Sequence, residues 1–146
     1  MSQQLSQLVF NDHLSEALVA EDAKRWEVEC PGGLEVWATM CPASALGERF
    51  QARLCWPVYP DQPPSLKFRD PATGRIDLPS AWPQVRGFRP PSLDACVTWC
   101  AEGFGLHPEW RNDLRYRWDP TGNPLLRILR TLQDELDNNY QGRFQG

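Results

Sequence analysis

The sequence predicts an α+β domain in which helices pack against one face of a four-stranded antiparallel sheet. Two observations lead to this fold class. Between residues 26 and 68, several segments carry apolar side chains at alternate positions, as strands do, whereas the segments before and after them have helical three- and four-residue spacing. Because the strands and the helices fall in separate runs, an antiparallel sheet is favoured over a parallel one. At 146 residues we expect one domain, 1–146.

The first element expected is a helix within residues 2–25. Ser2 is a suitable N-cap, and apolar side chains then recur at helical spacing: Leu5, Leu8, Val9, Leu14, Ala17 and Leu18. One amphipathic helix, or two short ones separated near Asn11, fits the pattern. We expect the apolar stripe to face the core.

An antiparallel meander follows. Its four strands are predicted at residues 26–30, 34–40, 49–56 and 65–68. The first two are joined by a Pro-Gly-Gly turn and form a hairpin. Four prolines separate the last two, and because proline lacks a backbone N–H and has a restricted φ, this segment is predicted to be a turn between strands. Cys55, in the third strand, is interpreted as a core residue.

The remaining chain is predicted to be a long irregular loop followed by a C-terminal helix. Residues 75–119 show no sustained periodicity, but their four tryptophans provide enough apolar surface to hold an ordered loop against the body. The helix begins at Pro124, and its apolar stripe consists of Leu125, Leu126, Ile128, Leu129, Leu132 and Leu136. Gln133 and Glu135 are expected to face water.

Composition excludes several classes of partner. The net charge of −4 argues against nucleic acid and against anionic membranes, both of which require a basic face. No apolar run approaches the roughly 20 residues that span a bilayer, and residues 1–10 lack the features of a signal peptide, so a cytoplasmic location is expected. Five irregularly spaced cysteines are a poor disulfide framework, which agrees with a reducing compartment.

The meander and its proline turn resemble the ubiquitin-conjugating enzyme family. The residues that carry the resemblance follow the family pattern of a W-x-A-T-I strand and a Y-P-x-x-P-P turn that leads into a V-x-F strand: Trp37, Ala38, Thr39, Met40, Tyr59, Pro60, Pro63, Pro64, Leu66 and Phe68. Trp118-Asp119-Pro120, before the last helix, is similar to the W-S-P element of the family. The chain ends soon after that helix, as in the shortened conjugating-enzyme homologues of bacteria.

The resemblance implies a function and a set of partners. A conjugating enzyme receives a ubiquitin-like protein from an activating enzyme, carries it as a cysteine thioester and transfers it to an amine of a target, without a metal or cofactor. In the family, the first helix and the adjoining hairpin contact the activating enzyme. The exposed face of residues 2–25 is therefore the contact expected here.

Two cysteines fit the position of the nucleophile. The family has an H-P-N element followed about ten residues later by G-x-I-C-L, and Arg89-Pro90-Pro91 is the nearest counterpart of H-P-N. Cys96, between Ala95 and Val97, has the better flanking residues, whereas Cys100 has the better spacing. We favour Cys96 because its neighbours decide whether the sulfur emerges from an extended segment, and we keep Cys100 as the alternative.

Groups that support amine attack are less specific. His107 is a candidate donor or base, Asn112 is a candidate oxyanion donor, and three acids are available: Asp94, Glu102 and Glu109. Two other functions remain open. One is a catalytically inactive binding or scaffold module, which the departure from H-P-N favours, and the other is a zinc-stabilised domain that uses Cys96, Cys100 and His107, although the spacing fits no common zinc pattern.

Overall fold

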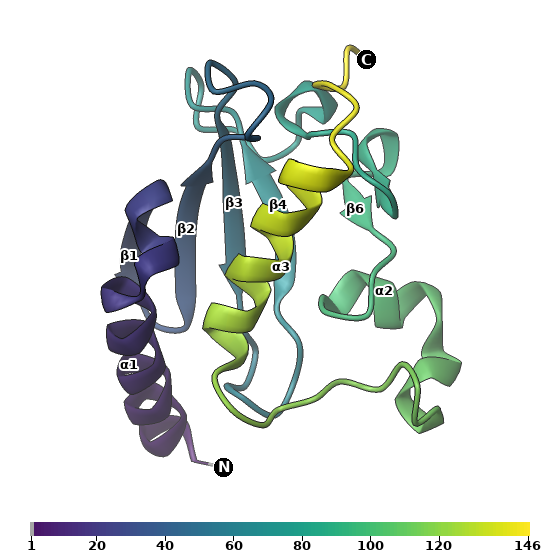
Figure 1. The fold of residues 1–146 in the computed structure, drawn as a ribbon. Helices are drawn as coiled ribbons and strands as arrows, with labels where there is room; N and C mark the ends of the chain where they lie inside the picture. The colour runs from purple at the N-terminus through teal and green to yellow at the C-terminus, as the bar shows by residue number, and fades with distance from the viewer. Residues whose placement is uncertain (1) are drawn as a thin grey trace.

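The computed structural model describes residues 2–146 and has the predicted N-terminal helix, four-stranded antiparallel sheet and C-terminal helix (Figure 1). Met1, part of the predicted domain 1–146, lies outside the described residues. The helices are α1 (Gln3–Val19), α2 (Ala101–Leu106) and α3 (Pro124–Asn138). Short 3-10 helices are η1 (Glu21–Arg25), η2 (Pro79–Ala81), η3 (Pro90–Ser92) and η4 (Pro108–Asn112). The strands are β1 (Glu27–Gly32), β2 (Glu35–Met40), β3 (Phe50–Cys55), β4 (Ser65–Arg69), β5 (Phe88–Arg89) and β6 (Asp94–Ala95).

The main sheet has the strand order β1-β2-β3-β4, and each neighbouring pair is antiparallel. Ala38, Ala52 and Phe68 are aligned across β2, β3 and β4 and are all fully buried. Helix α3 crosses this face of the sheet (Figure 1). Because side chains alternate between faces along a strand, Cys55 points to the opposite face from Leu54 and is half-buried, so its interpretation as a core residue was wrong.

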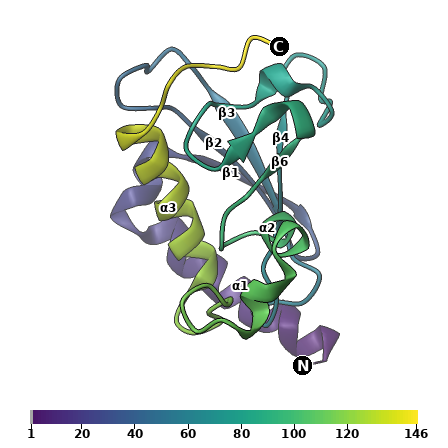
Figure 2. The same ribbon diagram turned by 90° about the vertical axis from the view of Figure 1, so that its right-hand side faces the viewer.

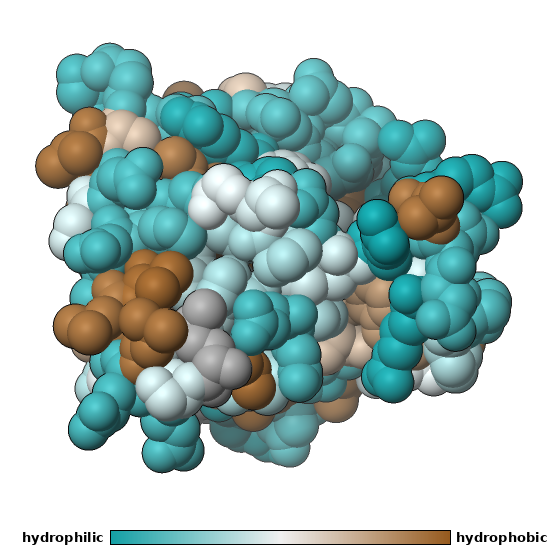
Figure 3. Space-filling view, turned by 90° about the horizontal axis from the view of Figure 1, so that it is seen from below, coloured by the Kyte–Doolittle hydropathy of each residue, from teal (hydrophilic) through white to brown (hydrophobic). Residues whose placement is uncertain are grey.

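Helix α1 is one continuous helix, and it buries only part of the predicted stripe: Ala17 is buried, and Val9 and Leu14 pack against the core. Its buried residues are Ser6, Phe10 and Ala17, whereas Leu5 and Leu8 are 48% and 63% exposed. Leu18 is exposed as well. Figure 3 shows hydrophobic surface at the left, the side on which α1 lies in Figure 1.

The orientation of α1 follows from specific contacts with the proline turn. The Phe10 ring packs edge-on against Tyr59 and Trp56. The Ser6 hydroxyl accepts a hydrogen bond from the Tyr59 N–H and donates one to the Tyr59 carbonyl. Aromatic packing and the pairing of buried backbone groups therefore outweigh the burial of two leucines.

Helix α3 buries the predicted stripe and one polar residue. Gln133 is 4% exposed, so the prediction that it faces water was wrong. Its amide accepts a hydrogen bond from the Trp26 indole and donates to the Cys41 carbonyl and to Asp137. These bonds satisfy the buried amide, which would otherwise destabilise the core.

The predicted irregular loop is ordered and contains the β5–β6 hairpin, helix α2 and the 3-10 helices η2, η3 and η4. Figure 1 shows this segment on the β4 side of the sheet, opposite α1, and Figure 2 shows it from that side. Trp82 is fully buried against Phe68 and Phe88, and Trp99 contacts Phe88 in turn. Trp82, Trp99 and Trp118 therefore anchor the loop to the core, as predicted, whereas the ring contacts of Trp110 are with other residues of the loop. Among residues 2–146, no helix is long and apolar enough to cross a membrane.

Candidate active site

The β5–β6 hairpin brings Cys96 to the surface. Phe88 pairs with Ala95 and Arg89 with Asp94, and η3 makes the turn between the two strands. Cys96 immediately follows β6, and its N–H donates a hydrogen bond of 2.7 Å to the Gly87 carbonyl. The nucleophile predicted from the sequence thus follows directly from a paired strand, which restricts its backbone.

The hairpin is attached to the main sheet by a lysine. Lys67 on β4 donates a hydrogen bond of 2.7 Å to the Leu93 carbonyl. Leu93 has φ +58°, a left-handed conformation that costs a non-glycine residue roughly 1–2 kcal/mol. The guanidinium of Arg89 pairs with both oxygens of Asp94 across the hairpin. These bonds hold a strained turn in place beside the thiol.

Cys96 is half-buried and lines an open hollow of about 260 Å³. The other lining residues are Arg86, Gly87, Val97, Thr98, Trp99 and Glu135. Arg86 is exposed and makes no hydrogen bond or ion pair with the described part of the chain. Glu135 comes from α3, and one of its oxygens accepts a hydrogen bond of 3.0 Å from the Asn139 amide. The hollow therefore combines a thiol with a free cation and a carboxylate.

Cys100 has a different environment. Its side chain is fully buried at the N-cap position of α2, and its thiol donates a hydrogen bond of 3.3 Å to the Ala95 carbonyl. Burial raises the pKa of this thiol to about 12, because the thiolate would lose its hydration. The Cys100 thiol is accordingly a packing group that is closed to solvent and neutral near pH 7.

His107 lies away from the hollow. It follows α2, its ring stacks on Trp110 at 4.4 Å between centroids, and its Nδ1 lies 3.0 Å from a Glu109 oxygen. Neither His107 nor Glu109 lines the Cys96 hollow.

The other candidate supporting groups also have other surroundings. Glu102 accepts hydrogen bonds from the Ser65 hydroxyl and the Leu66 N–H, and Asp94 is paired with Arg89. Asn112 is an exposed residue of η4 and does not line the hollow. None of these three residues lines the Cys96 hollow.

The sequence counterpart of H-P-N lies in the turn of the hairpin. Pro90 and Pro91 belong to η3, and Arg89 is occupied by Asp94. Within residues 2–146, no three His, Cys, Asp or Glu side chains gather where they could hold a metal ion. A zinc site made of Cys96, Cys100 and His107 therefore lacks a gathered ligand set.

Sequence reasoning missed Arg86 and Glu135 as neighbours of Cys96. Glu135 was interpreted only as a solvated residue of the last helix, and Arg86 lies in a segment without periodicity. No local pattern joins positions 86, 96 and 135, because the contact depends on how α3 crosses the sheet. Arg86, ten residues before Cys96, is the one of the two that proximity in the sequence could have indicated.

Comparisons of the chain with protein-family models, with curated proteins and with solved structures found no match.

Proposed function

We propose that this protein is a conjugating enzyme that carries a ubiquitin-like protein as a thioester on Cys96 and transfers it to an amine. The observation that carries the proposal is that Cys96, which is half-buried, lines an open hollow together with Arg86 and Glu135. The helix–meander–helix order and the sequence of the proline turn support it.

The first step is thioester exchange. The Cys96 thiolate attacks the carbonyl carbon of the incoming thioester, a new C–S bond forms, and the old C–S bond breaks. The departing thiolate takes up the proton that Cys96 released. The unpaired guanidinium of Arg86 is the group in the hollow that can donate hydrogen bonds to the oxyanion of the tetrahedral intermediate.

The second step is attack by an amine on the Cys96 thioester. The Glu135 carboxylate is the acid in the hollow, and it can orient an ammonium or accept its proton. The new amide bond forms as the C–S bond to Cys96 breaks, and Cys96 leaves as a thiolate. These roles replace the assignment of His107 as supporting group, because His107 does not line the hollow.

The outer face of α1 is the proposed contact for the activating enzyme. It combines exposed Leu5 and Leu8 with two exposed acids, Asp12 and Glu16, and α1 contains no lysine or arginine. A partner surface that is apolar with a basic rim complements this face. Leu8→Glu should slow loading by the activating enzyme at least tenfold and leave acylation by a small synthetic thioester unchanged.

Incubation with the activating enzyme and ubiquitin-like protein of the same organism and with ATP tests the function. The wild type should form an adduct that thiols cleave, Cys96→Ser should form a thiol-resistant oxyester, and Cys100→Ser should form the thioester. An adduct that needs Cys100 would move the nucleophile to that residue. No adduct at either cysteine would contradict an enzymatic role and favour the scaffold function.

A further inference from the structure

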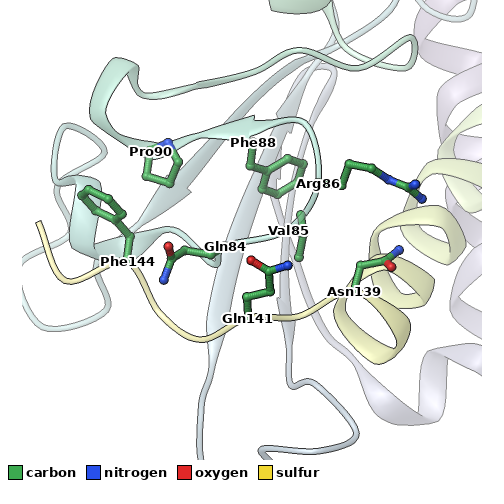
Figure 4. A pocket seen from close by; sticks show the side chains of 8 residues that line it. All are labelled: Gln84, Val85, Arg86, Phe88, Pro90, Asn139, Gln141 and Phe144. Carbon is green, nitrogen blue, oxygen red and sulfur yellow. The ribbon is translucent and has the colours of Figure 1, made fainter.

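Three arginines of this protein have unpaired guanidiniums. In the described part of the chain, every other arginine donates to an acid, an amide oxygen or a backbone carbonyl. The exceptions are Arg86, Arg111 and Arg117, whose guanidiniums make no hydrogen bond or ion pair with residues 2–146. Arg86 lies next to α3, where it lines the Cys96 hollow and a neighbouring cleft (Figure 4). The other two occur together in a different part of the molecule.

Arg111 and Arg117 line one cavity of about 490 Å³. We call it the turn cavity, because the proline turn forms part of its wall. Its lining comes from three segments: residues 57–63 of the proline turn, residues 101–104 of α2, and residues 111–120 of η4 and the following loop. In Figure 1 this loop runs from the α2 region along the lower edge of the molecule to the start of α3. The turn cavity and the Cys96 hollow share no lining residue.

Two hydrogen bonds fasten the walls of the turn cavity to one another. The Ala101 N–H donates to the Pro64 carbonyl at 2.7 Å, and the Trp118 indole N–H donates to the Pro60 carbonyl at 2.8 Å. Both acceptors belong to the proline turn, so α2 and the loop before α3 are held by the same short segment. Little order has to be created when a ligand enters such a cavity, so less binding energy is lost.

An apolar surface adjoins the two cations. Phe104 is 4% exposed and packs edge-on against Trp110, and Trp118 is half-buried. Pro57 and Pro63 add further apolar rings to the lining. Small-molecule sites commonly have volumes of roughly 300–1,000 Å³ and combine an apolar lining with a few polar groups. The turn cavity has this size and this combination.

The charge of the lining favours an anion. Two guanidiniums and one carboxylate, that of Asp61, leave one positive charge in excess in a protein whose net charge is −4. A phosphate monoester carries close to two negative charges near pH 7 and has three acceptor oxygens, so it can accept hydrogen bonds from both guanidiniums. A carboxylate has a single charge, which one guanidinium can already neutralise.

We propose that the turn cavity binds a small phosphate ester with an aromatic body, the chemistry of a nucleoside monophosphate. The phosphate is bound by Arg111 and Arg117, and the ring system lies against Phe104 and Trp118. The Gln62 amide, also in the lining, offers a donor and an acceptor to polar groups of the ring. This site goes beyond the proposed function and does not depend on Cys96.

Equilibrium dialysis with three radiolabelled probes tests the proposal: adenosine monophosphate, adenosine and inorganic phosphate, at physiological ionic strength. We expect the wild type to bind adenosine monophosphate at least tenfold more tightly than either of the other two, because only this probe has both the phosphate and the ring. Inorganic phosphate bound as tightly as adenosine monophosphate would indicate an adventitious ion only and would overturn the proposal.

Arginine variants locate the binding. Arg111→Gln and Arg117→Gln should each weaken the binding of adenosine monophosphate at least tenfold and leave that of adenosine unchanged. Arg115→Gln is the matched control and should stay within twofold of the wild type, because Arg115 is an exposed arginine between the other two that pairs with Asp113 and does not line the cavity. Equal unfolding temperatures for the three variants ensure that the comparison concerns folded protein.

The outcomes are separate from those for the proposed function. No binding of adenosine monophosphate at millimolar concentration, or binding that both Arg111→Gln and Arg117→Gln retain, would overturn the turn cavity as a phosphate-ester site and leave thioester formation at Cys96 untouched. A protein that forms no thioester but binds adenosine monophosphate through these two arginines would contradict the proposed function and support this site.

Discussion

Cys96, at the end of the β5–β6 hairpin, and Cys100, at the start of α2, are only four positions apart. The environments of their thiols are nevertheless opposite. Cys96 emerges beside β6 into an open hollow, whereas Cys100 is fully buried with its proton directed at the Ala95 carbonyl. Both cysteines lie in one aperiodic segment, in which the flanking residues favoured Cys96 and the spacing favoured Cys100. The difference in burial arises from the backbone segments that pack against each cysteine.

Helix α2 is pressed against the beginning of β4. The Ala101 N–H donates a hydrogen bond of 2.7 Å to the Pro64 carbonyl, and Glu102 accepts from Ser65 at 2.6 Å. Gly103 lies on the backbone of Val97, where a Cβ would come within 1.9 Å of the Val97 carbonyl oxygen. This contact seals Cys100 and at the same time supports the strand end that carries Cys96. The α2 region therefore keeps Cys100 buried, and the end of the hairpin leaves Cys96 at the open hollow.

The largest effect expected is on thiol reactivity. Iodoacetamide near pH 7.5 should modify Cys96 in the native protein and leave Cys100 intact. A thiol whose pKa is about 12 has roughly 10³-fold less thiolate than a free thiol. Peptide mapping by mass spectrometry reads each cysteine separately, and the exposed Cys30 is the positive control. Equal modification of the two loop cysteines would break the comparison.

The same burial gives a pH dependence of stability. The pKa of Cys100 is raised in the folded state. The contribution of its protonated thiol to the free energy of unfolding is therefore fully present below the unfolded pKa of about 8.5 and is lost as pH rises toward about 12. In that window the free energy of unfolding should fall by about 1 kcal/mol per pH unit relative to Cys100→Ala, in urea titrations. An identical pH profile for the two proteins would contradict the buried thiol.

The contact of α2 with the backbone of Val97 is tested next. Gly103→Ala should lower the free energy of unfolding by about 3 kcal/mol, because the new Cβ collides with backbone that cannot give way. Gly105→Ala, in the same helix, meets nothing within 4 Å and should range from neutral to about 1 kcal/mol more stable. Denaturant unfolding measures both. Similar values for the two variants would show that α2 does not press on Val97.

The attachment of the hairpin is expected to have a smaller effect. Lys67→Met removes the bond to the Leu93 carbonyl and should cost about 1–2 kcal/mol. Hydrogen exchange at the Cys96 N–H should become faster, since the hairpin loses its link to β4. Lys24→Met, at an exposed helical ion pair, is the control and should change neither quantity. Unchanged exchange at Cys96 would show that Lys67 does not hold the hairpin.

The smallest effect concerns the body of the molecule, away from both thiols. Hydrogen bonds from Arg25 lower the pKa of Asp137, so its stabilisation is present above the unfolded pKa of about 3.9 and is lost as pH falls through the lowered value. Asp137→Asn should lower the free energy of unfolding by about 1 kcal/mol at neutral pH in urea titrations, and this difference from the wild type should shrink below pH 4. Thiol reactivity should not change. A cost that stays constant down to pH 2.5 would contradict this account.

How much the sequence could reveal differs between the regular half of the chain and the loop. Alternation and proline placement predicted the meander closely, and the stripe of α3 predicted its buried face, because in these elements the local period decides which side chains meet the core. For α1 the period was only partly right, because Ala17 is buried and Val9 and Leu14 pack against the core, whereas Leu5, Leu8 and Leu18 are exposed. The contacts of Ser6 and Phe10 with the proline turn, which lies about fifty residues away, set the rotation of that helix.

The order of helix, meander, loop and helix was determined by the sequence alone, because turn residues and hydrophobic periodicity act over a few neighbouring positions. Tertiary structure decided which loop thiol meets solvent and which groups meet that thiol. Arg86, Cys96 and Glu135 lie in separate segments that only the packing of α3 and the hairpin brings together. Burial and proximity depend on contacts between distant parts of the chain, and no local pattern encodes them.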